Sequence, residues 1–231
     1  MGGREVPVGG VRADDSVTES SAPSLVVEET ASRAALGLGY DDAVAFAELL
    51  RVHGEERGLI GPRELDRLWT RHIVNSAAVA PYLPETGLVA DVGSGAGLPG
   101  IVLAAMRPDL EFHLVEPMER RVEWLKLVAT TLSLDNVVVH QNQAQELHCK
   151  LECSAVTARA VAALDKLVRW TWPLVARGGA LAAMKGARAA DELAAAQPVL
   201  KKLAGAGEGV VHEVDVLGDG DVTRVVEIRR R

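Results

Sequence analysis

A glycine-rich turn between an apolar run and a helix constrains this chain more than any other feature. Residues 88–103 read LVADVGSGAGLPGIVL, and the apolar run 88–92, which contains Asp91, is expected to form a buried strand. Three glycines follow at alternate positions, Gly93, Gly95 and Gly97. A helix is expected from Gly100 onward. Glycine permits the sharp turn and a close approach of the backbone to a ligand, and the first helical amides then point toward that ligand. The stretch therefore predicts a binding loop.

Two cofactor patterns fit this loop. From Gly95 the sequence matches the dinucleotide pattern G-x-G-x-x-G, and Glu116 stands about 20 residues further on, where an acid holds ribose hydroxyls. From Asp91 it matches D-x-G-x-G-x-G, which is typical of class I S-adenosylmethionine (SAM) methyltransferases. Both patterns predict an adenosine-containing cofactor. A glycine turn that binds no ligand is the remaining interpretation.

The composition is that of a globular, cytoplasmic protein. A chain of 231 residues with 48% hydrophobic residues suffices for one large domain with an appendage. No apolar run has the length of a membrane span, and the first residues lack the apolar core of a signal peptide. Cys149 and Cys153 have no His or Cys partner at metal-ligand spacing, so we expect packing or surface thiols and no metal site.

The net charge of −7 is unevenly distributed along the chain. Residues 1–60 contain 11 acidic and 5 basic residues, and the remaining 21 acidic and 20 basic residues nearly cancel. The main body is therefore close to neutral. Any affinity for nucleic acid must come from a local basic patch, because the chain offers no overall positive field.

The chain divides into three parts. Residues 1–24 are polar and without periodicity, which predicts a disordered tail. Residues 25–84 are expected to form a helical cap whose third helix, over 62–80, opens at Pro62. Residues 85–231 are expected to form the cofactor-binding domain.

Strands alternate with helices in this domain. The expected strands are 88–92, 110–116, 136–140, 154–158, 180–184, 209–217 and 222–229. The expected helices are 100–106, 119–132, the segment following Arg159, a helix end over 172–179, and 187–206 with an interruption near Pro198. The alternation predicts a doubly wound α/β sheet with its ligand at the carboxyl ends of the strands. The terminal antiparallel hairpin, signalled by GDGD at 218–221, is typical of class I SAM methyltransferases and therefore favours SAM over a dinucleotide.

Five segments together resemble one family. They are RHIVNS at 71–76, DVGSGAGLPG at 91–100, RRVEWL at 120–125, TARA at 157–160 and MKG at 184–186. In this order they resemble the bacterial 16S rRNA (guanine-N7) methyltransferases, also called ribosomal RNA small subunit methyltransferase G or glucose-inhibited division protein B. The resemblance covers residues 40–229. It implies a class I, Rossmann-like fold and a SAM-dependent enzyme that acts on 16S rRNA in the small ribosomal subunit or in an assembly intermediate.

The resemblance also implies a cofactor site. Gly93 and Leu98 would line it, and Glu116 would meet the ribose hydroxyls in place of the family's usual Asp. Ala144 and Gln145 would flank the adenine, although the family usually has an acid where this chain has Gln145. Arg159 would complete the pocket. The loop pattern itself adds Asp91 and Gly95 to these residues.

The proposed chemistry needs no catalytic base. Guanine N7 carries a lone pair and no proton, so the enzyme can rely on placing it in line with the methyl group. Cations dominate protein contacts to phosphate. The candidates for holding RNA are Arg71, His72, Arg159, Lys185, Arg120 and Arg121. Their alternative role is in ordinary ion pairs, and Lys185 and Arg159 are favoured as functional because they stand at the carboxyl ends of strands.

Two other functions remain open at this level. One is a SAM methyltransferase with a small-molecule substrate, which a cap that sealed a small pocket would favour. The other is a non-catalytic module that senses NAD or another nucleotide.

Overall fold

Seven strands form a mixed sheet in the computed structural model, which describes residues 22–231. The order across the sheet is β3-β2-β1-β4-β5-β7-β6. The strands are β1 (Leu88–Val92), β2 (Glu111–Val115), β3 (Val137–His140), β4 (Cys153–Arg159), β5 (Val175–Lys185), β6 (Val210–Asp215) and β7 (Val222–Arg229). Strands β1 to β5 run parallel, and β7 is antiparallel to both β5 and β6. The predicted doubly wound α/β sheet with a terminal antiparallel hairpin is confirmed.

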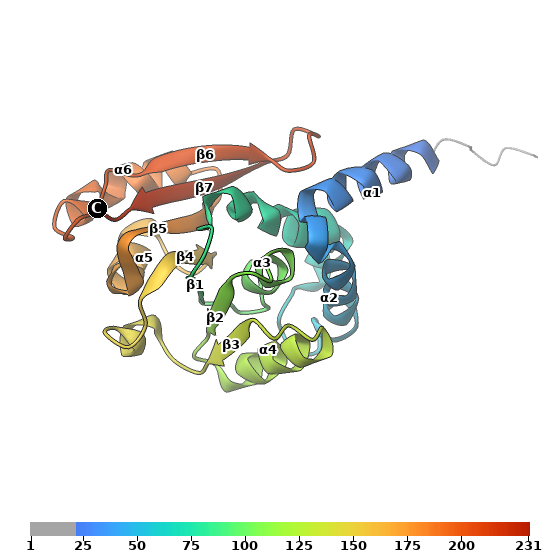
Figure 1. Ribbon diagram of the computed structural model, residues 1–231. Coiled ribbons are helices and arrows are strands. Elements are labelled where there is room, and N and C mark those ends of the chain that lie inside the picture. The colour runs from blue at the N-terminus through green and yellow to red at the C-terminus, as the bar shows by residue number, and fades with distance from the viewer. Residues whose placement is uncertain (1–21) are drawn as a thin grey trace, which may run out of the picture.

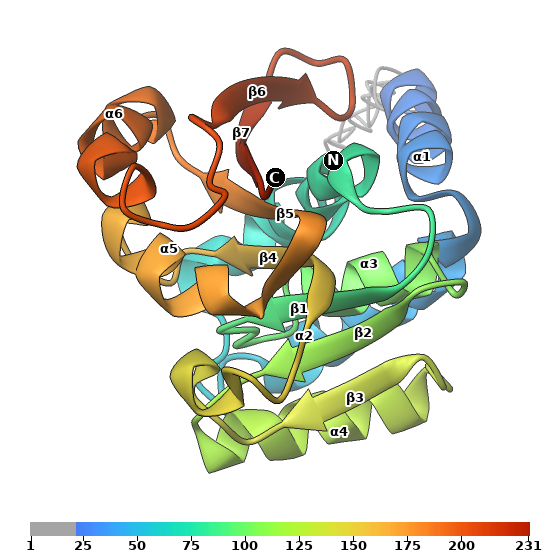
Figure 2. The same cartoon turned by 60° about the vertical axis from the view of Figure 1, so that its left-hand side comes forward.

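Helices cover both faces of this sheet (Figures 1 and 2). On one face α2 (Tyr40–His53), α3 (Gly100–Met106) and α4 (Glu119–Thr131) bury Phe46, Ile101 and Trp124 in one core cluster. On the other face α5 (Leu164–Thr171) and α6 (Ala189–Leu200) contribute to a second cluster. The order of the strands reverses between β1 and β4, so their carboxyl ends open a crevice at that point of the sheet.

The N-terminal part is helical and shares a core with the sheet. Helix α1 (Ala22–Leu36) projects from the body in Figure 1 and leads through a short 3₁₀ turn, η1 (Gly37–Gly39), into α2. A Cβ at Gly39 would lie 2.6 Å from the backbone nitrogen of Met106, so this junction packs directly on the end of α3. The predicted tail falls almost wholly on residues 1–21, outside the described residues.

The prediction of one α-helix over 62–80 is wrong. The segment is a 3₁₀ turn, η2 (Pro62–Arg67), a π-helix, η3 (Leu68–Val74), and another 3₁₀ turn, η4 (Ala77–Tyr82). The N–H of Asn75 donates to the carbonyl of Thr70, five residues earlier. The wider turn brings the buried side chains of Leu68 and Ile73, which are five positions apart, toward the same core.

Two further boundaries differ from the sequence predictions. Residues 172–179 are not a helix end: η6 (Trp172–Leu174) is a single 3₁₀ turn, and β5 already begins at Val175. The register between β4 and β5 shifts at this point, which accommodates the positive φ of 79° at Gly178. Helix α6 continues through Pro198, ends at Leu200 and does not resume.

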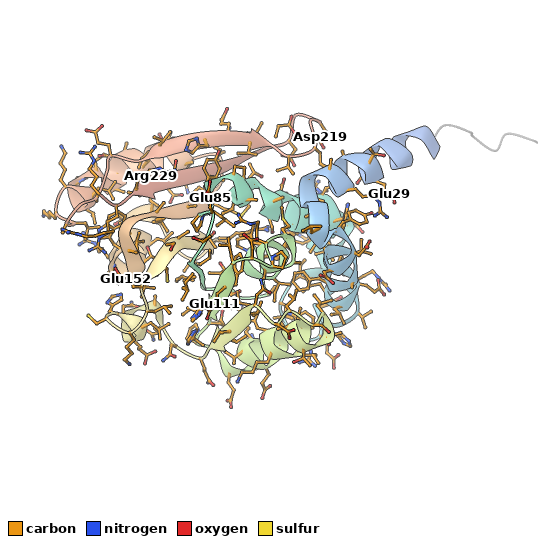
Figure 3. The ribbon with its side chains drawn as sticks, viewed as in Figure 1. Glu29, Glu85, Glu111, Glu152, Asp219 and Arg229 are labelled. Carbon is orange, nitrogen blue, oxygen red and sulfur yellow. The ribbon has the colours of Figure 1, made fainter. Side chains whose placement is uncertain are left out.

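The terminal hairpin closes the sheet. Asp219 is at the tip of its turn (Figure 3). The Asp215 carboxylate accepts the N–H groups of Gly218 and Gly220 at 2.7 and 2.9 Å. These bonds satisfy the amides of the tight turn and so fix the register of β6 against β7.

Candidate functional site

The glycine loop leaves β1 in a conformation that favours glycine. Gly93, Gly95 and Gly97 have φ angles of +70°, +58° and +103°. A Cβ at Gly93 would lie 2.6 Å from a methyl carbon of Val161, so the loop and the chain after β4 touch at this point. The indole N–H of Trp124 in α4 donates to the carbonyl of Ala96 at 2.9 Å and ties the loop to the helix layer.

Asp91 supports the loop from below. Its side chain is fully buried, and Oδ2 accepts the N–H of Gly100, at the beginning of α3, at 3.1 Å. Burial raises the pKa of this carboxyl from 3.8 to about 6, and the nearby Ser94 hydroxyl, the Gly100 N–H and the Arg159 cation offset only part of that effect. Asp91 therefore fixes the loop to α3 and contributes charge beneath it.

Glu116 follows β2 and faces the same loop. Its carboxylate accepts the N–H of Gly95 through Oε2 and the N–H of Met118 through Oε1, both at 3.0 Å. Arg121 Nη1 lies 3.8 Å from Oε2. Arg121, one of the candidates for holding RNA, is half-buried beside Glu116. Each carboxylate oxygen keeps a second lone pair for a ligand hydroxyl.

A cavity of about 460 Å³, which we call the loop cavity, opens above these groups. Its wall includes Gly93, Gly95, Leu98, Glu116, Arg121, His72 and Arg159. Two buried polar atoms at or beneath it, Thr157 Oγ1 and Arg121 Nε, have no hydrogen-bond partner among the described residues. Buried polar groups are nearly always paired, so these atoms point to a polar ligand or to ordered water in the loop cavity.

Arg159, at the end of β4, is held by the π-helix. Its guanidinium donates to the carbonyl of His72 at 3.3 Å and to Nδ1 of the same residue. His72 Nε2 lies 2.8 Å from a carboxylate oxygen of Glu64. Burial lowers the pKa of His72, as does the Arg159 cation, while Glu64 acts in the opposite direction. A neutral imidazole that accepts at Nδ1 and donates at Nε2 satisfies both partners.

A second cavity, of about 1150 Å³, adjoins the first, and we call it the arginine cavity. The polar residues of its wall are Arg67, Thr70, Arg71, Asn75, Arg159, Lys185, Arg188, Asp191, Glu192, Asp221 and Thr223. Arg159, Ala160 and Val161 line both cavities. The side chains of Arg67, Arg71 and Arg188 form no ion pair within residues 22–231, so three cations remain available to a ligand.

The sequence of residues 40–215 matches the family described as rRNA small subunit methyltransferase G. The chain belongs to this family. A ribosomal RNA small subunit methyltransferase G of Beutenbergia cavernae is 65% identical over 212 residues, which cover 92% of this chain and 100% of the relative. The protein of the same name from Clavibacter sepedonicus is 47% identical over 211 residues, which cover 89% of this chain and 97% of the relative. The predicted family and enzyme class are confirmed.

Solved methyltransferases share the fold. A precorrin-6Y C5,15-methyltransferase of Geobacter metallireducens aligns with a TM-score of 0.52 and 15% identity, covering 75% of this chain and 90% of that one. A methyltransferase homologue of Pyrococcus horikoshii aligns with a TM-score of 0.53 and 13% identity, covering 70% and 67%. These similarities confirm the class I fold. Membership of this methyltransferase family implies the use of SAM.

Not all the expected site residues meet at the two cavities. Ala144 is buried and Gln145 exposed in η5 (Ala144–Leu147), beyond the end of β3, and neither lines the loop cavity. Arg120 is exposed and lines neither cavity. The Lys185 amine, expected to hold RNA, instead donates a hydrogen bond to the carbonyl of Ala162 and forms an ion pair with Glu192.

Several residues near the two cavities were not predicted from the sequence. Glu64 and Arg188 carry no local motif; only the folded chain places Glu64 against His72 and Arg188 in the wall of the arginine cavity. Arg67 had a signal, because it precedes Arg71 by four positions and so shares a helical face with it. Among residues 22–231 the structure shows no cluster of His, Cys, Asp or Glu suited to a metal ion, and no helix long and apolar enough to span a bilayer.

Proposed function

We propose that this protein is a SAM-dependent methyltransferase that methylates N7 of a guanine in 16S rRNA. One observation carries the proposal: two cavities of different chemistry share the wall formed by Arg159, Ala160 and Val161. A methyl donor and its acceptor must meet at such a boundary. Membership of the rRNA small subunit methyltransferase G family supports this choice of donor and acceptor.

The loop cavity suits SAM. The left-handed glycines bring backbone close to a ligand, and Glu116 offers free lone pairs to ribose hydroxyls. The buried Asp91 carboxylate lies beneath the loop and contributes negative charge there. When bound, SAM would supply a methyl group on a positively charged sulfur. Ala144 and Gln145 flank the adenine in this proposal, provided that the η5 segment moves toward the cavity when the cofactor binds.

The arginine cavity suits RNA. Arg67, Arg71 and Arg188 offer unpaired guanidinium groups, which hold phosphate oxygens in a planar fork. Its volume of about 1150 Å³ exceeds the roughly 300–1,000 Å³ typical of small-molecule sites. The cap does not seal a small pocket here, so a polymer end or an extruded nucleotide is favoured over a small-molecule substrate. The local cations also provide the basic patch that a nearly neutral body requires.

The chemistry at the shared wall requires placement and no proton transfer. His72, which lines the loop cavity, has both ring nitrogens engaged by Arg159 and Glu64 and is not available as a base. Guanine N7 has no proton to lose, so the lack of a free base there suits this acceptor. Arg159 remains at the boundary, where its cation can orient an anionic group of either ligand.

The test is methyl transfer from labelled SAM to 16S rRNA from cells that lack this protein. Small ribosomal subunits, a partly assembled particle and naked RNA are assayed side by side, and nucleosides are then separated. We expect label in 7-methylguanosine, lost with Gly93→Leu. It should be retained with Gly218→Leu, a matched control with a similar φ of +72° and open space around it. Label in another nucleoside would refute the N7 assignment, and SAM binding without RNA labelling would refute the substrate.

A further inference from the structure

A short segment separates the two cavities. Residues 160–163, which we call the dividing segment, follow Arg159 and precede α5; Ala160 and Val161 line both cavities. Ala160 has a φ of +55°, a left-handed conformation that residues other than glycine rarely adopt because it is strained. Such a conformation persists only where the surrounding structure holds it in place.

Two side chains from neighbouring elements hold the dividing segment through hydrogen bonds. Lys185, the last residue of β5, donates from Nζ to the carbonyl of Ala162 at 2.6 Å. The same Nζ lies 2.9 Å from Glu192 Oε2 in α6. That carboxylate oxygen also accepts the N–H of Leu164, the first residue of α5, at 2.9 Å. One ammonium and one carboxylate therefore hold both the segment and the helix that follows it.

The pair is partly withdrawn from water. The Lys185 side chain is only 7% exposed, and that of Glu192 is 28% exposed. An ammonium leaves water at a high energetic cost, which its hydrogen bonds to Ala162 and Glu192 offset here. An amine engaged in this way is poorly placed to bind RNA phosphate, whereas Arg67, Arg71 and Arg188 are free to do so.

Val161 connects the residues held by Lys185 and Glu192 to the glycine loop. A methyl carbon of Val161 lies 2.6 Å from the position of a Cβ on Gly93, and Val161 directly precedes the gripped Ala162. A shift of Ala162 would therefore move the wall above the glycine loop as well as the wall of the arginine cavity.

We propose that Lys185 and Glu192 are positioning residues that clamp the dividing segment and thereby fix the two cavities relative to each other. This inference rests on the proposed function in assigning the cavities to SAM and RNA. It reverses the expectation from sequence that Lys185 itself holds RNA. It predicts that a change at a residue lining the RNA side alters SAM binding in the absence of RNA.

The test compares Lys185→Met, Glu192→Gln and the double variant in the full chain. We expect each to weaken SAM binding about tenfold by calorimetry without RNA, and the double variant to lose little more, because the two side chains act as one unit. Hydrogen exchange of residues 160–167 in the cofactor-free protein should increase in all three. Lys202→Met and Glu208→Gln, both at exposed positions, should change neither quantity.

An RNA-binding role for Lys185 would give a different result. Lys185→Met would then leave SAM affinity and the hydrogen exchange of residues 160–167 unchanged. It would instead reduce the salt dependence of RNA binding by about one charge. Glu192→Gln would leave RNA binding unaffected. That outcome overturns the proposal. If the wild-type protein fails to methylate RNA, the proposed function is refuted but the positioning role of Lys185 and Glu192 is not. SAM affinity and the hydrogen exchange of residues 160–167 still test that role.

A rescue variant distinguishes the loss of positioning from a general loss of folding. Ala160→Gly removes the left-handed strain, so the dividing segment should keep its conformation with less support. Adding it to Lys185→Met should recover part of the lost SAM affinity, and Lys185→Arg should recover part by restoring charge and donors. If neither change recovers any affinity in a folded protein, the clamp is not what positions the segment.

Discussion

Arg159 and His72, 87 residues apart in the chain, are joined through the imidazole Nδ1 and the backbone carbonyl of His72. The contact joins the carboxyl end of β4 to the π-helix of the cap. Both residues line the loop cavity. Because Arg159 also lines the arginine cavity, its orientation matters to both proposed ligands. His72 therefore acts as a support for Arg159.

Replacing His72 by Leu should weaken SAM binding about tenfold. The change removes the ring acceptor of Arg159, and a hydrogen bond to a charged group contributes about 1.5–3 kcal/mol. Calorimetric titration of the purified variant with SAM measures the effect. Glu64→Gln is the matched control, because its amide oxygen still accepts from Nε2, and it should lose less than about threefold. Unchanged SAM affinity in His72→Leu would contradict this role.

The same imidazole predicts a pH dependence of stability. Burial lowers the pKa of His72 in the folded state, so the unfolded chain, with a pKa near 6.5, binds this proton more readily. The contribution of His72 to the free energy of unfolding is therefore fully present above about pH 6.5. It declines as the pH falls toward the lowered pKa of His72 in the folded state. Urea unfolding of wild type and His72→Leu at pH 5 to 8 should show a difference that shrinks with falling pH. A difference that grows would refute it.

The contact between Gly93 and Val161 predicts a compensating pair of substitutions. Gly93→Ala places a methyl group 2.6 Å from Val161 in a left-handed backbone, which should cost about 1–3 kcal/mol of stability and most of the SAM affinity. Val161→Ala removes the clash and should restore part of both in the double variant. Denaturant unfolding and SAM titration of the four proteins form a double-mutant cycle. Strict additivity would show that the two residues do not interact.

The sheet could be predicted because its signals are local. Each strand signal, such as an apolar run, the glycines after Asp91 or the GDGD turn, specifies only its own few residues. All seven expected strands form, although β5 begins earlier than predicted, at Val175. The π-helix at 68–74 could not be predicted in this way. An α-helix and a π-helix differ by one residue in their hydrogen bonds, and burial of Leu68 and Ile73 in the shared core accompanies the wider turn.

Site residues that a loop or a strand end positions could be predicted from the sequence. Contacts between side chains that are distant in the sequence could not be predicted. Gly93 and Glu116 line one cavity because a strand end and a loop place them there. Lys185 was expected to be free, since nothing in its neighbourhood along the chain reveals Glu192 on the following helix as its partner. Arg121 was a candidate for holding RNA, yet its guanidinium lies 3.8 Å from the Glu116 carboxylate in the folded chain.

Asp91→Asn should raise stability at neutral pH and lower SAM affinity at the same time. The folded state raises the pKa of Asp91 from 3.8 to about 6, so between these values the native protein binds more protons than the unfolded chain. Wild type should therefore lose on the order of 3 kcal/mol relative to Asp91→Asn as the pH rises from 4 to 7. The lost affinity follows because a carboxylate beneath the loop attracts a cationic cofactor.

Urea unfolding across this pH range and SAM titration at pH 7.5 measure the two effects. Asp135→Asn, at an exposed position, is the control and should change stability by less than about 0.5 kcal/mol. If Asp91→Asn is less stable than wild type at pH 7.5, the Gly100 N–H bond to the ionised carboxylate outweighs the cost of burying the charge. Higher stability with undiminished SAM affinity would instead confine Asp91 to holding α3 in place.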